Sequence, residues 1–372
     1  MGCGRSRRNT VRIALITPEY PGYGPSFGIG RYVADLAESL RTAGHTVLVL
    51  AATDEGGVVV GVDRSPESMP RSLLRRSLVV RPWLMHELEL FQPDVVEAPN
   101  WGGLTALLPS RWPLVVRLST SAVDAFGPRR DLWRPFRILL EKVAVHRAHG
   151  IIADSCSMGR RCVSLYSRNA DVVIPHAWRG QGVSTVTERG PDVLFVGRWE
   201  PRKGVDVLMR AWPEVLAAMP QARLHLVGNG QPKGLAGPGI QAHGHLPPTS
   251  LASLRQLCKI QVVPSRFESF GLVVLEAWAA GLVPVVSAGG ALPEVVGDAG
   301  MVVPVGDSTA LSRTLLQVIH RDGTSMVEAG LRRLAGEFSP ILHLQATLAL
   351  YRLAISRQRT GCYQRVCSVS SP

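Results

Sequence analysis

The segment Phe267–Glu276 reads FESFGLVVLE and decides the fold expected for this part of the chain. It follows the apolar run Ile260–Val263, which predicts a buried strand. The apolar residues after Gly271 predict a helix, so a short loop containing glycine joins the strand to the start of the helix. Two carboxylates, Glu268 and Glu276, stand eight residues apart across this joint.

The start of a helix at this joint has a chemical consequence. The first N–H groups of a helix lack an intrahelical acceptor, and the helix dipole adds partial positive charge, so the position suits a phosphate group. This phosphate-binding position is flanked by carboxylates, which can accept hydrogen bonds from hydroxyl groups. The combination suits a nucleotide sugar. A buried strand–helix joint with two solvated glutamates is the alternative, and the other motifs of the chain weigh against it.

The remaining sequence alternates strand and helix patterns in two series. The apolar run Val11–Ile16, a glycine-rich loop and a helical pattern over Ile29–Ala43 together predict a βαβ unit. Further predicted strands cover residues 46–51, 94–97, 113–118, 150–154 and 171–175, and then 192–196, 223–227, 240–243, 260–263, 283–286 and 300–303. Because these runs lack an alternating polar face, the sheets are expected to be parallel and covered on both sides.

The two series predict two α/β domains, and a chain of 372 residues exceeds the usual size of a single core. The expected bounds are residues 1–178 for the first domain, 179–191 for a linker, 192–340 for the second domain, 341–358 for a last helix and 359–372 for a disordered tail. Ligands are expected at the carboxyl ends of the strands, between the domains.

Composition and charge disfavour several functional classes. The formal net charge is +12, but both halves of the chain share it and no basic tail stands out, which argues against nucleic-acid binding. The six cysteines form no CxxC pair and have no histidine at zinc spacing, so free thiols in a reducing cytoplasm and no metal site are expected. No window of eighteen uncharged apolar residues predicts a transmembrane helix, and no secretory leader is expected.

A basic motif follows the predicted strand 192–196. Gly197–Gly204 reads GRWEPRKG and places Arg198 and Lys203 in a loop at the end of that strand. An arginine can bind phosphate oxygens as a fork and a lysine as a point charge, so the two can clamp a diphosphate. Two solvated surface cations are the alternative, which the carboxylate motif makes the weaker interpretation.

The first βα loop, Gly22–Gly30, is rich in glycine and includes Gly28 next to the predicted helix. Backbone N–H groups in such a loop can approach a phosphate or a sugar closely because no Cβ intervenes. The loop is not a clean GxGxxG fingerprint, and no acidic residue closes a second strand as a nicotinamide dinucleotide site requires. Both observations disfavour a dehydrogenase.

Taken together, these motifs resemble those of the retaining glycosyltransferases of family 4, which have the GT-B fold. Arg198 and Lys203 match a G-R-x4-K-G motif, and Glu268 and Glu276 match E-x7-E. The resemblance covers roughly residues 11–358. It implies two Rossmann-like α/β domains facing across a cleft, with a C-terminal helix that returns to the first domain. The first domain would face the acceptor, and the second would bind the donor.

The resemblance also implies a role for each motif residue. Arg198 and Lys203 would bind the donor diphosphate and stabilise the departing nucleotide. Glu276 would hold the ribose hydroxyls, and Glu268 would hold hydroxyls of the donor sugar. The donor site would further include Gly28, Ser269, Phe270, Gly271 and Leu272. Such enzymes use the nucleotide sugar as co-substrate without a metal or other cofactor, since cations can offset the charge on the leaving phosphate, which itself can take the acceptor's proton.

One position departs from the family pattern. The family commonly has a histidine at the end of the strand that corresponds here to residues 113–118, and this chain has Ser119 and Thr120 there. Both hydroxyls are candidate contacts of the sugar or the acceptor, and His176 is a candidate substitute for the histidine. The departure raises a second hypothesis, in which the chain is a catalytically weak nucleotide-sugar-binding protein. Another GT-B activity, such as sucrose-type synthesis, is the alternative among enzymes.

The acceptor is not identified by these motifs. A sugar or lipid-linked acceptor is expected, in a cell-surface polysaccharide or glycolipid pathway. Residues 64–147 hold 13 basic and 8 acidic residues, and the segments 71–76 and 129–137 interleave arginines with apolar side chains. Such segments are typical of peripheral contact with an anionic membrane, at the inner face for a cytoplasmic protein. An ordinary solvated helix face is the simpler interpretation.

Overall fold

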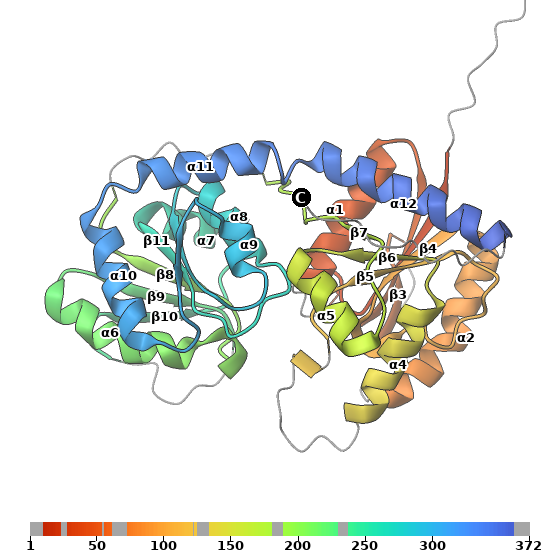
Figure 1. Cartoon of the computed structure of the whole chain (residues 1–372), viewed down its shortest axis with the longest axis horizontal. Coiled ribbons are helices and arrows are strands. Elements are labelled where there is room, and N and C mark those ends of the chain that lie inside the picture. Colours follow the sequence, from red (N-terminus) through yellow and green to blue (C-terminus); the bar gives the residue numbers. More distant parts are fainter. Residues whose placement is uncertain are drawn as a thin grey trace, which may run out of the picture. The chain divides into compact units, whose positions relative to one another are not determined.

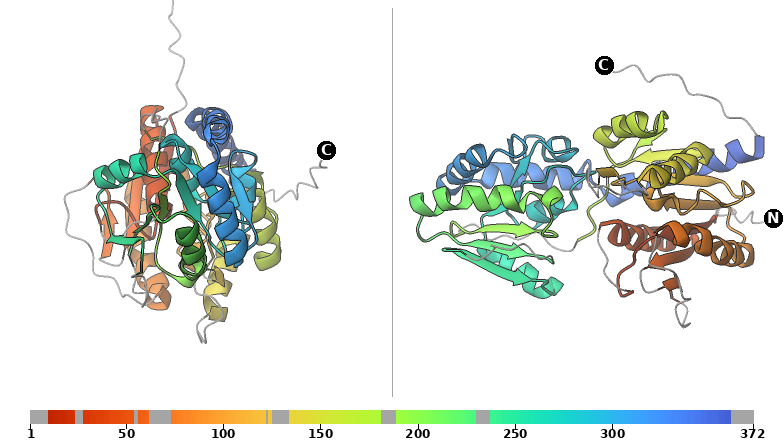
Figure 2. Two further views of the ribbon diagram at one scale, coloured as in Figure 1. Left: turned by 90° about the vertical axis from the view of Figure 1, so that its left-hand side faces the viewer. Right: turned by 90° about the horizontal axis from the view of Figure 1, so that it is seen from below.

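The computed structural model describes residues 10–23, 28–53, 56–61, 73–121, 123–124, 134–180, 189–229 and 237–360 of the chain. The chain divides into two compact units. One comprises the described residues of Met1–Asp154, Met158–Ile174 and Pro340–Pro372, and the other those of Ser155–Ser157 and Pro175–Ser339. Each unit contains one sheet with helices on both of its faces (Figure 1, Figure 2).

The described part of the first unit contains a seven-stranded sheet in the order β3-β2-β1-β4-β5-β6-β7. Its strands are β1 (Arg12–Thr17), β2 (Thr46–Thr53), β3 (Gly56–Val59), β4 (Val95–Pro99), β5 (Leu114–Leu118), β6 (Gly150–Ala153) and β7 (Val172–Val173). Neighbouring strands are parallel except β2 and β3, which are antiparallel. The inner strands β4 and β5 are buried along their whole length, as expected of parallel strands covered on both faces.

Helices α1 and α12 share one hydrophobic cluster with this sheet. The helices of the unit are α1 (Gly28–Thr42), α2 (Leu73–Phe91), η1 (Trp101–Gly103), α4 (Arg134–Arg147), α5 (Cys156–Tyr166) and α12 (Pro340–Thr360). The cluster contains Ile13 of β1, Leu36 of α1 and Leu350 of α12. Figure 1 shows α12 beside α1. Helix α4 contributes Leu140 and Ala144 to a separate cluster.

A buried ion pair fastens α12 to the sheet of the first unit. Arg117 on β5 donates from Nε to Oε1 of Glu97 on β4 at 3.0 Å, and both side chains are 4% exposed. Tyr351 on α12 donates its hydroxyl to Oε2 of Glu97 at 2.7 Å, and the Tyr32 hydroxyl of α1 donates to Oε1 at 3.3 Å. Arg117 also donates to Thr347 Oγ1 of α12 at 3.4 Å. These hydrogen bonds satisfy charges that water cannot reach.

The described part of the second unit contains a six-stranded parallel sheet in the order β10-β9-β8-β11-β12-β13. Its strands are β8 (Val193–Val196), β9 (Leu224–Val227), β10 (Ile240–Gly244), β11 (Ile260–Val263), β12 (Val283–Ser287) and β13 (Met301–Val303). Its helices are η2 (Pro201–Lys203), α6 (Val205–Ala218), α7 (Pro248–Leu257), α8 (Leu272–Ala279), α9 (Leu292–Val296), α10 (Ser308–His320) and α11 (Thr324–Ala335).

Successive residues of β8 lie in different hydrophobic clusters, because side chains alternate along a strand. Phe195 belongs to a cluster that includes Trp212 of α6 and Leu315 of α10. Leu194 belongs to a cluster with Leu254 of α7 and Ala277 of α8. The sheet is thus covered on both faces. Residues that bind a ligand can therefore lie on the loops at the ends of its strands.

Both sheets reverse their strand order next to their first strand. The reversal lies between β1 and β4 in the first unit and between β8 and β11 in the second. The loops that follow two such strands lead to opposite faces of the sheet, and ligands of open α/β sheets bind at this switch point. The basic motif follows β8 and the FESFG segment follows β11, so both belong to the switch point of the second unit.

The structure confirms the predicted fold of two Rossmann-like α/β units and a C-terminal helix packed in the first unit, and it differs at the edges. The strand Gly56–Val59 was not predicted, since it is four residues long and half glycine, which is disfavoured in strands. The last helix spans Pro340–Thr360 rather than 341–358, and proline suits its first position. Residues 181–188 of the predicted linker and 361–372 of the predicted tail lie outside the described residues.

Candidate functional site

Three loops of the second unit meet at the carboxyl ends of β8, β11 and β12. The amide of Arg266, after β11, donates to the carbonyl of Arg202, after β8, at 2.7 Å. Glu268 forms an isolated parallel bridge with Gly290, after β12, and its carbonyl accepts from the Ala291 amide at 2.9 Å. Backbone hydrogen bonds therefore hold the basic motif and the first glutamate of the E-x7-E motif together.

Glycine is required where these loops approach most closely. Gly204 has φ +71°, and a Cβ on it would lie 1.9 Å from the carbonyl oxygen of Pro264. A Cβ on Gly290, with φ +67°, would lie 2.1 Å from the carbonyl oxygen of Glu268. Both contacts are with backbone atoms, which cannot rotate away as a side chain can. The last glycine of the basic motif therefore permits the loops to pack.

We expect Gly204→Ala to lower the free energy of unfolding more than Gly306→Ala. Gly306 has a similar φ of +81°, but among the described residues no atom lies within 4 Å of an added Cβ. Its substitution should cost only the left-handed backbone energy of about 1–2 kcal/mol. Gly204→Ala adds the clash with Pro264. Chemical denaturation of both variants measures the difference, and equal losses would contradict the close approach of the loops.

Five charged side chains form an ion cluster on these loops. Lys203 donates from Nζ to Oε1 of Glu268 at 2.5 Å, and Nη1 of Arg202 lies 3.5 Å from Oε2. Oε1 of Glu200 lies 2.9 Å from Nη2 of Arg202 and 3.3 Å from Nη2 of Arg198. Three cations face two carboxylates, so the cluster carries one net positive charge. Its most exposed side chain is Arg198, at 41%.

Glu268 is the buried centre of the ion cluster, with 9% of its side chain exposed. Burial by itself raises the pKa of this carboxyl. The charges of Lys203 and Arg202, with hydrogen bonds from Lys203 and Ser265, outweigh burial and hold the pKa below its ordinary value of 4.5. Ser265 Oγ donates to Oε1 at 2.9 Å. Glu268 is therefore an anion at neutral pH and can only accept hydrogen bonds.

The lowered pKa of Glu268 links stability to pH. Because the folded pKa lies below the unfolded value of 4.5, the ionised carboxylate stabilises the fold fully above that pH, and this is lost as pH falls through the folded pKa. Between about pH 5 and pH 3, the wild type is expected to lose stability more steeply than Glu268→Gln. Chemical denaturation at each pH measures both slopes, with Glu328→Gln on an exposed residue as control. Parallel slopes would contradict an ionised Glu268.

Helix α8 starts directly after the loop that holds Glu268. Gly271, with φ 101°, precedes its first residue, Leu272, and as a glycine it offers no side chain to cap the helix. Phe270 is 2% exposed and packs edge-on against His176, with ring centroids 4.9 Å apart. The ring anchors the loop in the core and so fixes the backbone N–H groups at the start of α8. Ser269, in the same loop, is half-buried.

The second glutamate has a cationic partner outside the motifs. Glu276 lies in the second turn of α8, and Arg255 of α7 donates from Nη2 to its Oε2. The side chains are 13% exposed for Arg255 and 21% exposed for Glu276. The structure thus places Glu276 in the same unit as Arg198, Lys203 and Glu268, with a fixed hydrogen bond on one oxygen.

Three residues of the predicted site belong to the first unit. Gly28 is the first residue of α1, where the carboxylate of Glu19 accepts from the Gly30 amide at 2.9 Å. The Glu19 carboxylate thus already accepts a hydrogen bond from an amide in the first turn of this helix. Ser119 and Thr120 follow β5 and are half-buried.

A buried hydrogen-bonded chain fixes Ser119. Its amide and its Oγ both donate to Oδ1 of Asn100, at 2.7 and 3.1 Å. Asn100 Nδ2 donates to the Tyr166 hydroxyl at 3.0 Å, and that hydroxyl donates to Oε2 of Glu141 at 2.7 Å. Burial, together with the nearby Glu141 carboxylate, holds the pKa of Tyr166 far above its ordinary range, so Tyr166 stays a neutral donor. Ser119 thus has a defined position, and its oxygen can still accept a hydrogen bond.

Glu200, Arg202 and Arg255 contact the predicted site residues but received no role from the sequence. Glu200 and Arg202 stand inside the basic motif, so alternating charge in a loop at a strand end was an available signal. Arg255 stands 21 residues before Glu276, and no spacing pattern connects the two.

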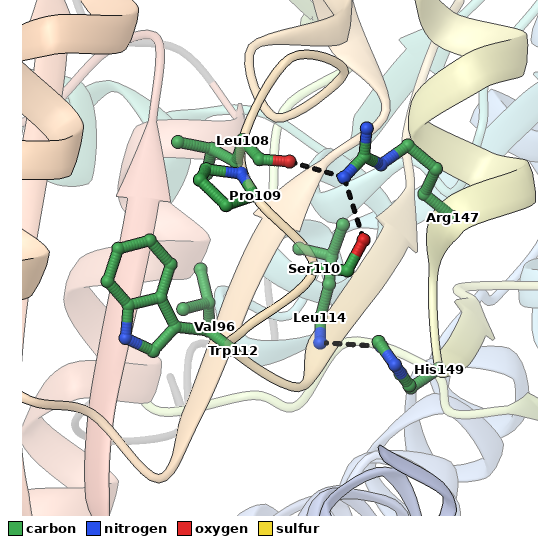
Figure 3. A pocket seen from close by; sticks show the side chains of 8 residues that line it. All are labelled: Val96, Leu108, Pro109, Ser110, Trp112, Leu114, Arg147 and His149. Atoms are coloured by element: carbon green, nitrogen blue, oxygen red, sulfur yellow. Dashed lines mark hydrogen bonds between the residues drawn. The ribbon is translucent and has the colours of Figure 1, made fainter. Parts of the chain in front are cut away.

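Two hollows among the described residues lie away from the ion cluster. A cavity of about 10 Å³ in the first unit is lined by Val96, Leu108, Pro109, Ser110, Trp112, Leu114, Arg147 and His149. Figure 3 shows Arg147 donating to Ser110 Oγ and to the Leu108 carbonyl. Leu114 is the first residue of β5, so the cavity lies at the opposite end of that strand from Ser119, and it has room for about one water. A second hollow, of about 450 Å³, lies beside Arg223 and Ile240, at the amino ends of β9 and β10.

In the part of the chain that the structure describes, no group of three or more His, Cys, Asp or Glu side chains is arranged to hold a metal ion. No helix within the described ranges has the length and hydropathy to cross a membrane. Cys162 and Cys258 are buried free thiols, and burial raises the pKa of both to about 12, so they are poor nucleophiles.

Two family models and several curated relatives match this chain. Residues 28–177 match the family model described as Glycosyltransferase Family 4, and residues 190–321 match that of Glycosyl transferases group 1. The chain is 30% identical to a D-inositol 3-phosphate glycosyltransferase from a Nocardioides species, over 93% of this chain and 90% of that protein. It is 29% identical to a phosphatidyl-myo-inositol mannosyltransferase from Mycolicibacterium smegmatis, over 84% of this chain and 86% of that protein.

A solved structure supports the fold independently. Sucrose-phosphate synthase from Thermosynechococcus elongatus superposes with a TM-score of 0.77 at 21% sequence identity. The match covers 93% of this chain and 99% of that one. Similarity at this level of identity shows the GT-B fold and not the reaction.

Proposed function

The chain belongs to the group 1 glycosyltransferases of family 4, and on this premise we propose that it transfers a sugar, with retention, from a nucleoside diphosphate sugar to an acceptor hydroxyl. One observation supports the proposal most. A net positive ion cluster and the uncapped start of α8 share the switch point of the second sheet. This combination suits a diphosphate.

In the proposed complex, the diphosphate lies between the basic loop and the start of α8. The Lys203 ammonium has three donors, of which one goes to Glu268, so the others can reach phosphate oxygens. Arg198, the most exposed cation of the cluster, can bind them as a fork. The N–H groups of Gly271 and Leu272 can add hydrogen bonds. None of these contributions requires a metal ion, and transfer without a metal is part of the proposal.

The two glutamates supply acceptors for hydroxyl groups on either side of that diphosphate. Oε1 of Glu268 already accepts from Lys203 and Ser265, so the carboxylate has a fixed orientation. In the proposed complex it accepts from hydroxyls of the transferred sugar, while Glu276 accepts from the ribose. His176, which packs on Phe270, is a candidate sugar contact in the same unit.

Retention without an enzyme nucleophile is the proposed course of the reaction. The bond between the anomeric carbon and the phosphate oxygen breaks, and the bond to the acceptor oxygen forms on the same face of the sugar. The departing phosphate takes the acceptor's proton. The cations Arg198 and Lys203 stabilise the negative charge that develops on the phosphate, and stabilisation of this kind is usually the largest single term in catalysis.

We further propose that the acceptor carries a phosphorylated inositol ring. The two relatives named above act on D-inositol 3-phosphate and on phosphatidyl-myo-inositol, which share this ring. On the first unit, α4 exposes Phe136 (38%) and Leu139 (53%) on one helix face and carries Arg134 and Arg137. Such a face suits peripheral contact with an anionic membrane, at the cytoplasmic side.

The structure describes only part of the two predicted basic segments, 71–76 and 129–137. The side chains of residues 73–78 and the whole of residues 71–72 and 129–133 lie outside the described residues. The proposed membrane face therefore rests on α4. Ser119 and Thr120, on the same unit, remain candidate contacts of the acceptor.

Incubation with UDP-, GDP- and ADP-sugars, together with inositol 3-phosphate or vesicles containing phosphatidylinositol, tests the proposed function. We expect one donor to yield a glycosylated inositol whose anomeric configuration, read by NMR, equals that of the donor. A product of inverted anomeric configuration would contradict the retaining mechanism. Turnover of the donor without transfer to either inositol compound would contradict the proposed acceptor. Donor binding without turnover would favour a nucleotide-sugar-binding protein.

A further inference from the structure

Arg255 is a charged residue of the second unit to which the family motifs give no role. It lies in the last turn of α7 and donates to Oε2 of Glu276 on α8. With 13% and 21% of the two side chains exposed, the pair is largely shielded from water. A shielded, charge-assisted hydrogen bond orients a carboxylate more firmly than an exposed surface pair does.

A second arginine, Arg189, links the two helices that carry this pair. Arg189 donates from Nη1 to the carbonyls of Arg255 and Cys258, at 2.6 and 2.8 Å. It donates from Nη2 to the carbonyl of Ala280, the C-cap residue of α8, at 2.5 Å. One guanidinium thus binds the C-terminal ends of α7 and α8, where a positive charge also complements both helix dipoles. The Arg255–Glu276 pair therefore spans two helices with a fixed separation.

Two features of the pair point to a ligand. Nε of Arg255 is buried and has no hydrogen-bond partner among the described residues, which is rare for a buried N–H group. Arg255 engages only Oε2 of Glu276, which leaves Oε1 for other partners. A ligand that carries both hydroxyl donors and an oxygen acceptor would complete the hydrogen bonding of both side chains.

We infer that Arg255 is a positioning residue of the donor site, which fixes the Glu276 carboxylate to accept hydrogen bonds from the ribose hydroxyls. The inference rests on the proposed function. Two neighbouring hydroxyls need two acceptor positions at a set spacing, and an unrestrained glutamate must be ordered when the ligand binds. Because Arg255 orders Glu276 before the ligand binds, the ribose hydroxyls contribute to the affinity of the donor in addition to the phosphates and the base.

Comparing a nucleotide with its 2′-deoxy counterpart isolates the contribution of the ribose hydroxyl. Calorimetric titration of the full chain with UDP, GDP and ADP identifies the nucleotide bound most tightly, which is then compared with its 2′-deoxy form. The wild type is expected to favour the ribonucleotide by about 10- to 100-fold, as for a hydrogen bond to a charged group. Arg255→Met should reduce this ratio to about threefold or less while leaving the affinity for the deoxynucleotide nearly unchanged.

Three further variants make the comparison specific. Glu276→Gln should lower the preference for the ribonucleotide over the deoxynucleotide as Arg255→Met does. The double variant should lower this preference no further, because both residues act through one carboxylate. Arg255→Lys should keep part of the ratio, and it carries the same comparison if Arg255→Met is unfolded. Arg313→Met removes an exposed arginine of α10 and should keep the wild-type ratio. Thermal unfolding verifies that each variant is folded.

The outcomes separate this inference from the proposed function. If Glu276→Gln loses the ratio and Arg255→Met keeps it, the positioning role is wrong and the donor site stands. Equal weakening of both nucleotides by Arg255→Met would show a general charge or packing effect and would also overturn the inference. If the wild type binds none of the three nucleotides, the proposed function fails, and this inference fails with it.

Discussion

Replacing Lys203 with alanine is expected to lower the turnover of the donor by about 100- to 1,000-fold. The substitution removes the ammonium group that lies 2.5 Å from Glu268 and is proposed to stabilise the leaving phosphate. It also leaves the buried Glu268 carboxylate with only Arg202 and Ser265 as polar side-chain neighbours among the described residues. Since the leaving phosphate carries more charge in the transition state than in the bound donor, kcat should fall more than KM rises.

Initial rates of nucleotide release over a range of donor concentrations separate the two constants. Lys142→Ala, on α4 of the first unit, removes a lysine that is no part of the ion cluster and should keep the wild-type rate. Lys203→Arg retains a positive charge with a different shape and should recover part of the loss. A Lys203→Ala variant with more than about a tenth of the wild-type kcat would show that the ammonium group does not stabilise the leaving group.

Breaking the buried ion pair of the first unit is expected to have the largest effect on stability. Glu97→Gln removes the charge that faces Arg117, whose side chain is only 4% exposed. Leaving such a charge without its partner costs about 3–5 kcal/mol of the free energy of unfolding. Burial, reinforced by the Glu97 carboxylate, holds the pKa of Tyr351 well above its ordinary range, so Tyr351 remains a neutral donor to this site. Because Tyr351 and Thr347 belong to α12, that helix should lose protection first.

Chemical denaturation measures the loss, and hydrogen exchange of the α12 amides locates it. Glu89→Gln is the matched control, since its pair with Arg111 has 47% of each side chain exposed and should contribute less than about 1 kcal/mol. Combining Glu97→Leu with Arg117→Met should recover much of the stability because no lone charge stays buried. Similar losses from Glu97→Gln and Glu89→Gln would contradict the role given to the buried pair.

The loops after β8 and β11 show how far the sequence could predict the site. Buried parallel strands are continuous apolar runs, so the ends of these strands could be located, and β11 spans Ile260–Val263 as predicted. The contact of Lys203 with Glu268, which stand 65 residues apart, requires that β8 and β11 be neighbours. Strand order depends on how helices cover the two faces of the sheet, which no local pattern records.

Asn100 and Arg255 show why the rest could not be predicted. Asn100 follows β4 and looks like an ordinary turn residue, yet its side chain is fully buried and holds Ser119, which lies 19 residues later, directly after the neighbouring strand β5. The sequence alone suggests that Arg255 is an exposed cation on a helix. Its contact with Glu276 forms only because α7 and α8 pack together. In both cases the partner is chosen by the packing of elements, and the residue type alone is compatible with a solvent-facing position.

The proposed function is tested most directly by nucleotide release from a panel of UDP-, GDP- and ADP-sugars, with Glu276→Gln and Lys203→Ala measured beside the wild type. We predict that the wild type releases nucleotide from one donor and that both variants lose this activity. Failure of the wild type to bind or cleave any of these donors would contradict a donor site at the switch point of the second sheet.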